Sequence, residues 1–117
     1  MTLDEIQQWE IDFAKRKGVP QDYETALNFA VLKLSEETGE VCRGILKEDW
    51  ANVQEECFDV LSFLCKITYL MQEFHGAEKW SDVCADKIAL VEKRAKMDPK
   101  THRMQKTATE LADEKNE

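Results

Sequence analysis

Two segments of this chain place carboxylates inside apolar patterns that repeat with the period of an α-helix. The first reads KLSEETGEVCRGI and begins at Lys33, and the second reads NVQEECFDVLSFL and begins at Asn52. Soluble helices usually keep glutamates on the face that meets water. A chain that folds both segments as helices must therefore either solvate these acids or compensate their charge inside the fold.

Apolar residues recur at helical spacing through most of the chain, which predicts an all-α protein. The 117 residues suffice for one domain with a modest core, and four glycines and two prolines leave little material for hairpins. We expect residues 1–98 to form this domain and residues 99–117 to form a polar tail, helical or disordered. The expected helices are one carrying the stripe Leu3, Ile6, Trp9 and Phe13, a second from about Tyr23 to Leu46, a third ending near Phe74, and a fourth from Asp82 to about Lys96.

Polar residues at the breaks predict where these helices begin. Asp22 is placed to cap the second helix, and Ser81 is placed to cap the fourth. For the third helix, Asn52 followed by Glu55 resembles a capping box, and Asp49 is a competing cap.

The composition limits the kind of partner and the compartment. With 24 acidic against 16 basic residues the net charge is −8, which disfavours nucleic acid or an anionic membrane as the main partner. The start, MTLDEIQQWE, has acids where a signal peptide needs bases, and no apolar run is long enough to span a membrane. The cysteines lack C-x-x-C spacing and lie in apolar helical contexts, so we expect buried free thiols in a reducing, cytoplasmic setting. They are Cys42, Cys57, Cys65 and Cys84.

The helical rotation of about 100° per residue predicts where the acids point. On the second helix Glu37 borders the apolar stripe, and Glu40 lies about 60° to its other side. On the third helix Glu56 lies near the middle of the apolar stripe, with Asp59 at its edge. An unpaired carboxylate in that position costs free energy or stays protonated, so we expect some of these acids to face inward.

Three arrangements would compensate inward carboxylates. They are a buried salt-bridge network, with Lys33 as the main candidate base, protons shared between carboxyls, or a hard divalent cation, which prefers carboxylate oxygens. Solvated or locally paired acids remain an alternative for either segment taken alone. That alternative is disfavoured for the two segments together.

The paired pattern E-E-x-x-E and, on the next helix, E-x-x-D resembles the all-α nucleoside triphosphate pyrophosphohydrolases of the MazG-like superfamily. The match runs roughly over residues 26–70. The resemblance implies a MazG-like bundle of four to five helices, assembled as a homodimer or homotetramer. It also implies a Mg²⁺-dependent enzyme, with Mn²⁺ as a substitute, that cleaves a (d)NTP to a (d)NMP and pyrophosphate in nucleotide-pool housekeeping. The acids that carry the pattern are Glu36, Glu37, Glu40, Glu56 and Asp59.

The resemblance also implies roles for individual residues. The metal ligands would be the four acids Glu37, Glu40, Glu56 and Asp59. Glu36 would orient the attacking water or touch a second metal, although a solvated acid is the alternative there. Val91 stands about where the family often has an asparagine, which puts the substrate contacts of the fourth helix in question. The candidate substrate contacts are Lys33, Lys87 and Arg94 for phosphate and Trp50 for stacking on the base.

Other classes of protein compete with this reading. Within the enzymes, a phosphoribosyl-ATP pyrophosphohydrolase-like activity remains an alternative. Outside them, the acids would form a structural cluster in a non-catalytic helical interaction module. A di-iron carboxylate bundle is disfavoured because neither histidine has an acid three residues before it.

The third helix also predicts self-association. Its side opposite Glu56 is apolar as well, so the helix is apolar nearly all round, as expected of one buried in a larger assembly. We therefore expect at least a homodimer. The residues on that side are Phe58, Leu61, Cys65 and Tyr69.

Overall fold

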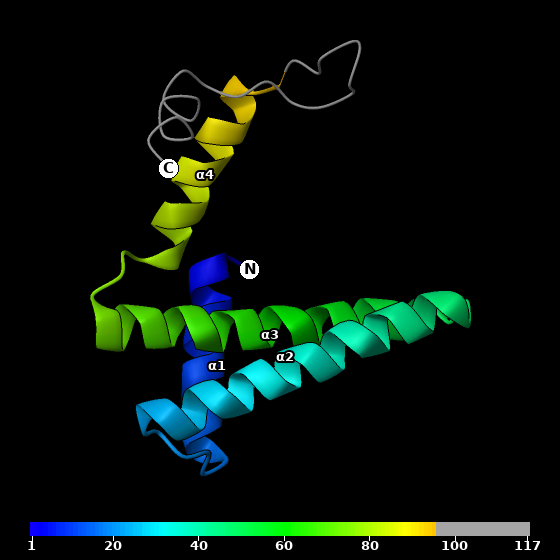
Figure 1. The fold of residues 1–117 in the computed structure, drawn as a ribbon, viewed down its shortest axis with the longest axis horizontal. Coiled ribbons are helices and arrows are strands. Elements are labelled where there is room, and N and C mark those ends of the chain that lie inside the picture. The colour runs from blue at the N-terminus through cyan, green and yellow to red at the C-terminus, as the bar shows by residue number, and fades with distance from the viewer. Residues whose placement is uncertain (96–117) are drawn as a thin grey trace, which may run out of the picture. The chain divides into compact units, whose positions relative to one another are not determined.

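The computed structural model describes residues 1–95, and every regular element in that range is an α-helix (Figure 1). The all-α prediction is confirmed for this part of the chain. The tail expected at 99–117 and the predicted end of the fourth helix near Lys96 lie outside the described residues. The helices are α1 (Leu3–Arg16), α2 (Tyr23–Leu46), α3 (Trp50–His75) and α4 (Trp80–Lys93).

The caps explain where the first three helices begin. Thr2 and Glu5 form a capping box at α1, with side-chain to backbone bonds of 3.2 Å in both directions. Asp22 caps α2 as predicted, accepting from the Thr25 N–H at 3.1 Å. At α3 the cap is Asp49, which accepts from the N–H of Asn52 at 3.4 Å. Asn52 is therefore drawn into the first turn, and α3 starts earlier than a cap at Asn52 would allow.

The predicted start of the fourth helix is wrong. Ser81 lies inside α4, because the helix already begins at Trp80. The backbone N–H of Trp80 donates to the side-chain oxygen Oε1 of Gln72 at 2.9 Å. A side chain from α3 thus satisfies a backbone donor for which we expected a local cap.

The chain divides into two units, Met1–Trp80 and Ser81–Glu117, which are described separately. In the first unit α2 runs along α3, while α1 crosses α3 steeply (Figure 1). The backbones of α1 and α2 do not approach each other. Within this unit α3 is therefore the central helix, with α1 and α2 both packed against it. No helix between residues 1 and 95 has the length and apolar run that a bilayer crossing requires.

The packing of α2 on α3 is close at one end and aromatic at the other. Near the end of α2 and the start of α3, a Cβ atom placed on Gly44 would lie 2.8 Å from Cγ2 of Val53. At the opposite end, Tyr23 Oη and His75 Nε2 form a hydrogen bond of 2.6 Å, and the Tyr23 ring lies 5.0 Å from that of Phe74. The two helices are thus antiparallel and in a fixed register.

The packing of α1 on α3 has a buried polar component. Glu10 is 7% exposed and accepts a 2.6 Å hydrogen bond from the Ser62 hydroxyl. Next to this pair, Lys66 is only 3% exposed. Among residues 1–95 the buried base is therefore Lys66 on the α1 side of α3, and not Lys33 on α2 as expected. A second buried polar residue, Gln7, donates to Thr68 Oγ1 at 3.1 Å.

The cysteine prediction is only partly right. All four thiols are free, and Cys65 is fully buried on the α1 side of α3. Cys84 is half-buried, but Cys42 and Cys57 are exposed, because the sides of α2 and α3 that carry them are not covered within the described residues. On the side of α3 opposite Glu56, which we expected a partner chain to cover, Cys65 is already buried within the described residues, whereas Phe58 remains 43% exposed.

Candidate metal centre

Three carboxylates converge between α2 and α3. Oxygen atoms of Glu37, Glu56 and Asp59 all lie within 4.8 Å of one another, and the three residues are half-buried. The spacing of three residues puts Glu56 and Asp59 on one face of α3. The antiparallel packing of α2 then brings Glu37 opposite them. We refer to these three residues as the acid cluster.

The acid cluster carries charge that the described protein does not compensate. Within residues 1–95 no basic side chain forms an ion pair with any of its members. Oε2 of Glu56 is buried and has no hydrogen-bond partner in that range. A buried, unpartnered oxygen among acids indicates that a cation or a proton belongs there.

The pKa values of the cluster respond to this crowding. The neighbouring Glu37 carboxyl, to which a protonated Glu56 can donate a hydrogen bond, is the largest cause that raises the pKa of Glu56, followed by burial and by the negative charges of Glu37 and Glu40. For Asp59, burial raises the pKa most, and the charge of Glu56 adds to it. Both shifts favour the protonated form, because burial and the repulsion between neighbouring carboxylates disfavour negative charge here when no cation is present.

The donor set fits a hard divalent cation. Such ions take oxygen ligands, and the smaller ones are typically held by a few carboxylates together with water and substrate phosphates. Three convergent carboxylates, one with an unpartnered oxygen, supply that kind of site. Glu37, Glu56 and Asp59 are the residues that would hold the ion.

Glu40 and Glu36 stand apart from the cluster. Glu40 forms an ion pair with Arg43 one turn later on α2. The carboxylate of Glu36 is 62% exposed and lies 3.1 Å from the ammonium of Lys33. The structure therefore brings together three of the four expected ligands. Arg43 was not considered from the sequence, although its spacing from Glu40 is that of a helical ion pair.

The candidate substrate residues are more scattered. Trp50 is the first residue of α3 and 60% exposed, about 9 Å along the helix axis from Glu56 at 1.5 Å per residue. Trp50 thus belongs to the same helix as Glu56 and Asp59. Lys87 is exposed on α4, Val91 is half-buried on the same helix, and Arg94 follows its end. These three belong to the second unit and are described only within it.

An aromatic pocket of about 340 Å³ opens beside the acid cluster and shares Asp59 with it. In its wall the rings of Trp9 and Phe58 lie 5.7 Å apart, and those of Phe29 and Phe63 lie 6.2 Å apart. Its polar lining includes Glu10, Ser62 and Lys66. This pocket was not predicted from the sequence. The available signal was Glu10 itself, which lies four residues after Ile6 on the apolar stripe of the first helix.

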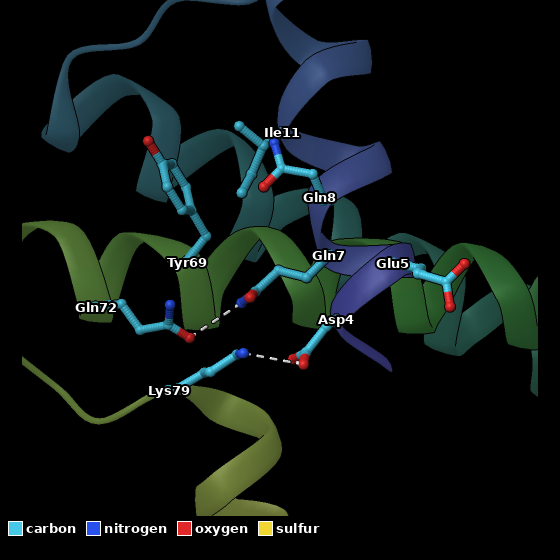
Figure 2. A pocket seen from close by; sticks show the side chains of 8 residues that line it. All are labelled: Asp4, Glu5, Gln7, Gln8, Ile11, Tyr69, Gln72 and Lys79. Atoms are coloured by element: carbon cyan, nitrogen blue, oxygen red, sulfur yellow. Dashed lines mark hydrogen bonds and ion pairs between the residues drawn. The ribbon is translucent and has the colours of Figure 1, made fainter. Parts of the chain in front are cut away.

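A larger and more open cavity, of about 590 Å³, lies over the first turns of α1 (Figure 2). Gln7 reaches across it to Gln72 at 3.2 Å, and Lys79 pairs with Asp4 at 3.1 Å (Figure 2). It contains no member of the acid cluster. We therefore look for the functional site at the acid cluster and not at the larger cavity.

The fold and the acid cluster define a class, namely all-α proteins that gather carboxylates between two antiparallel helices. The chain matches the family of MazG nucleotide pyrophosphohydrolase domains over residues 26–102, which is more than half of its 117 residues. The chain belongs to this family. The match includes the whole acid cluster and supports a hydrolase that acts on nucleotides, as the resemblance predicted. No curated protein and no solved structure matches the chain.

Proposed function

We propose that this protein is a Mg²⁺-dependent nucleoside triphosphate pyrophosphohydrolase that converts a (d)NTP to a (d)NMP and pyrophosphate. We assign it to nucleotide-pool housekeeping in the cytoplasm. The observation that carries the proposal is the convergence of Glu37, Glu56 and Asp59 around a buried, unpartnered oxygen of Glu56. Membership of the MazG family supports cleavage of a nucleotide pyrophosphate bond.

The acid cluster holds and places the metal. When bound, Mg²⁺ neutralises the triphosphate, which the acids would otherwise repel, and polarises the α-phosphorus towards attack by water. Glu40 completes the ligand set, since its charge already acts on Glu56. To do so, the Glu40 carboxylate must leave its ion pair with Arg43 and turn towards the acid cluster.

The two ion pairs on α2 suggest how substrate binding prepares the site. Phosphate oxygens are strong acceptors for Lys and Arg, so an incoming triphosphate competes for Lys33 and Arg43. Its binding releases Glu36 from Lys33 and Glu40 from Arg43. Glu36 would then be available to orient the attacking water, and Glu40 would be free to hold the metal together with the acid cluster. In this proposal Lys87 and Arg94 add further phosphate contacts, and Trp50 stacks on the nucleobase.

Product analysis tests the reaction. The purified protein is incubated with Mg²⁺ and a panel of canonical and modified nucleoside triphosphates, with phosphoribosyl-ATP in the same panel. We expect a monophosphate and pyrophosphate. A diphosphate and orthophosphate would overturn the assignment of the scissile bond. Turnover of phosphoribosyl-ATP alone would favour the alternative enzyme, and no turnover at all would favour the interaction module.

We also propose that the protein works as a homodimer at least. The surface of α2 and the first residue of α3 expose large apolar side chains, among them Leu46 at 83%, Leu32 at 67% and Trp50 at 60%. Large apolar side chains exposed to this extent are often covered in an interface. Light scattering at micromolar concentration should give a mass of at least two chains, and the mass of one chain would contradict the proposal.

A further inference from the structure

The aromatic pocket contains a buried acid and a buried base, Glu10 and Lys66, that have no role in the proposed metal site. Glu10 and Lys66 are 7% and 3% exposed, and both line the pocket. Burying an acid and a base near each other costs desolvation, which their mutual attraction repays only with good geometry. No ion pair within 4 Å joins the two in the described protein. The hydrogen bond from Ser62 to Glu10, at 2.6 Å, fixes the carboxylate in place.

The position of the pocket fits a nucleobase. One wall includes Asp59, so an occupant would lie beside a triphosphate held at the acid cluster. The volume of about 340 Å³ lies within the usual range for small-molecule pockets, about 300–1,000 Å³. Rings from three helices, including Trp9 of α1, Phe29 of α2 and Phe58 of α3, offer flat apolar faces on which a base stacks.

The polar end matches the edge of a base. A carboxylate accepts hydrogen bonds and cannot donate them, whereas an ammonium group only donates. Every canonical nucleobase carries an N–H group next to a carbonyl or ring-nitrogen acceptor on its pairing edge. Glu10 would receive the N–H group, and Lys66 would donate to the adjacent acceptor.

We propose that Glu10 is a specificity-determining residue that reads the hydrogen-bonding edge of the nucleobase in this pocket, with Ser62 as its positioning residue. The proposal rests on the proposed function for the placement of the triphosphate. It predicts that a nucleotide whose edge N–H is replaced by N-methyl is rejected, because the buried carboxylate would be left without its partner. Trp50, about 9 Å along α3 from Glu56, would not contribute to this discrimination.

The first experiment compares kcat/KM for the best (d)NTP substrate and for the same nucleotide methylated at its edge nitrogen. We expect wild type to favour the unmethylated substrate by about 100-fold or more. Glu10→Gln should reduce that ratio at least about tenfold, mainly through KM for the unmethylated substrate. Ser62→Ala should reduce it less, since the carboxylate remains but is no longer oriented.

A matched control lies on the same helix interface. Gln7 is buried at 6% and bonds to Thr68, but it does not line the aromatic pocket. Gln7→Met should lower the melting temperature and leave the methylation ratio unchanged. If Gln7→Met and Glu10→Gln change the ratio equally, Glu10 acts only through the packing of α1 and the proposal fails.

The second experiment measures binding without catalysis. Binding of nucleoside monophosphates is measured in EDTA through the fluorescence of Trp9, with Trp9→Phe as the blank. We expect quenching in wild type and at least about tenfold weaker binding by Glu10→Gln. If the protein binds monophosphates in this way but turns over no nucleotide, the proposed function is wrong and the assignment of the base pocket is supported. Turnover with an unchanged methylation ratio in both Glu10→Gln and Ser62→Ala would overturn the base pocket and leave the proposed function standing.

Discussion

Gly44 of α2 faces Val53 of α3 so closely that a Cβ atom on Gly44 would lie 2.8 Å from Cγ2 of Val53. Two carbon atoms do not pack at that distance, so the helices can approach here only because position 44 has no side chain. The acid cluster spans the same pair of helices. The separation of α2 and α3 at this point therefore also governs how closely Glu37 approaches Glu56.

The first prediction concerns this contact. Gly44→Ala should destabilise the protein by about 1–3 kcal/mol, because Val53 or the helix backbone must move. The matched control is Gly39→Ala on the same helix, where the atoms nearest to the new Cβ would be those of the flexible Arg43 guanidinium, at 3.4 Å. There the better helix propensity of alanine should leave stability unchanged or raise it by up to about 1 kcal/mol. Denaturant unfolding of the three proteins measures both, and equal stability of the two variants would contradict the close packing.

The second prediction concerns Glu56. Glu56→Gln keeps the shape of the side chain but removes one charge and a strong ligand, so activity should fall by orders of magnitude. Without metal the variant should be no less stable than wild type, because repulsion within the acid cluster is relieved. It should also lose most of the rise in melting temperature that millimolar Mg²⁺ gives wild type through binding to the folded state.

Its neighbour provides the control. Glu55 is exposed, and Glu55→Gln should leave activity and the Mg²⁺ response near those of wild type. If Glu56 instead forms a salt bridge, the opposite result is expected. In that case Glu56→Gln melts well below wild type in EDTA, and wild type ignores Mg²⁺.

The third prediction is the dependence of stability on pH. The pKa values of Glu56 and Asp59 are raised above their ordinary 4.5 and 3.8. A carboxyl with a raised folded-state pKa stabilises the fold below its ordinary pKa, and this contribution is lost as the pH rises through the raised value. In EDTA the melting temperature of wild type should therefore fall, as the pH is raised above the ordinary pKa of these carboxyls, by more than that of Glu56→Gln. If the melting temperatures of the two proteins change with pH in parallel, the ionised form of Glu56 does not destabilise the fold.

The fourth prediction concerns the thiols. Burial, with the nearby charge of Glu10, raises the pKa of Cys65 to about 11, and the residue is fully buried. At pH 8 its reactive thiolate is therefore scarce and inaccessible. Cys42 and Cys57 are exposed and should be alkylated promptly in the native protein, whereas Cys65 should react only after unfolding. Peptide mass spectrometry after timed alkylation distinguishes the sites, and labelling of Cys65 as fast as Cys42 would disprove its burial.

Local patterns were enough to predict much of this structure. Helical spacing and the Asp22 cap placed α2 correctly at Tyr23–Leu46. The rotation of the helix put Glu56 in the apolar stripe of α3, and the structure places it between α2 and α3 beside Glu37. These features depend on spacing within one helix or on two helices joined by a short connection, so the sequence carries them directly.

The features that could not be predicted from the sequence depend on which helices pack against each other and on which side chains then pair. The place of Glu10 on the apolar stripe of its helix indicates burial, but its pairing with residues of α3 such as Ser62 follows from the crossing of α1 over α3, which no pattern within either helix specifies. Glu40 was expected at the cluster, but Arg43 pairs with it instead. A choice between two nearby partners is decided by side-chain geometry, which helical spacing alone does not resolve.

The central place of α3 also sets an order of assembly. The connection from α2 to α3 runs only from Leu46 to Trp50, so this pair closes with little loss of chain entropy. The hydrogen bond from Gln7 to Thr68, in contrast, joins residues 61 positions apart. Although α1 leaves the ribosome before α3, it has no docking surface until α3 has been made. The hairpin of α2 and α3 would therefore bring the acids together first. The aromatic pocket beside them would form only when α1 packs on α3.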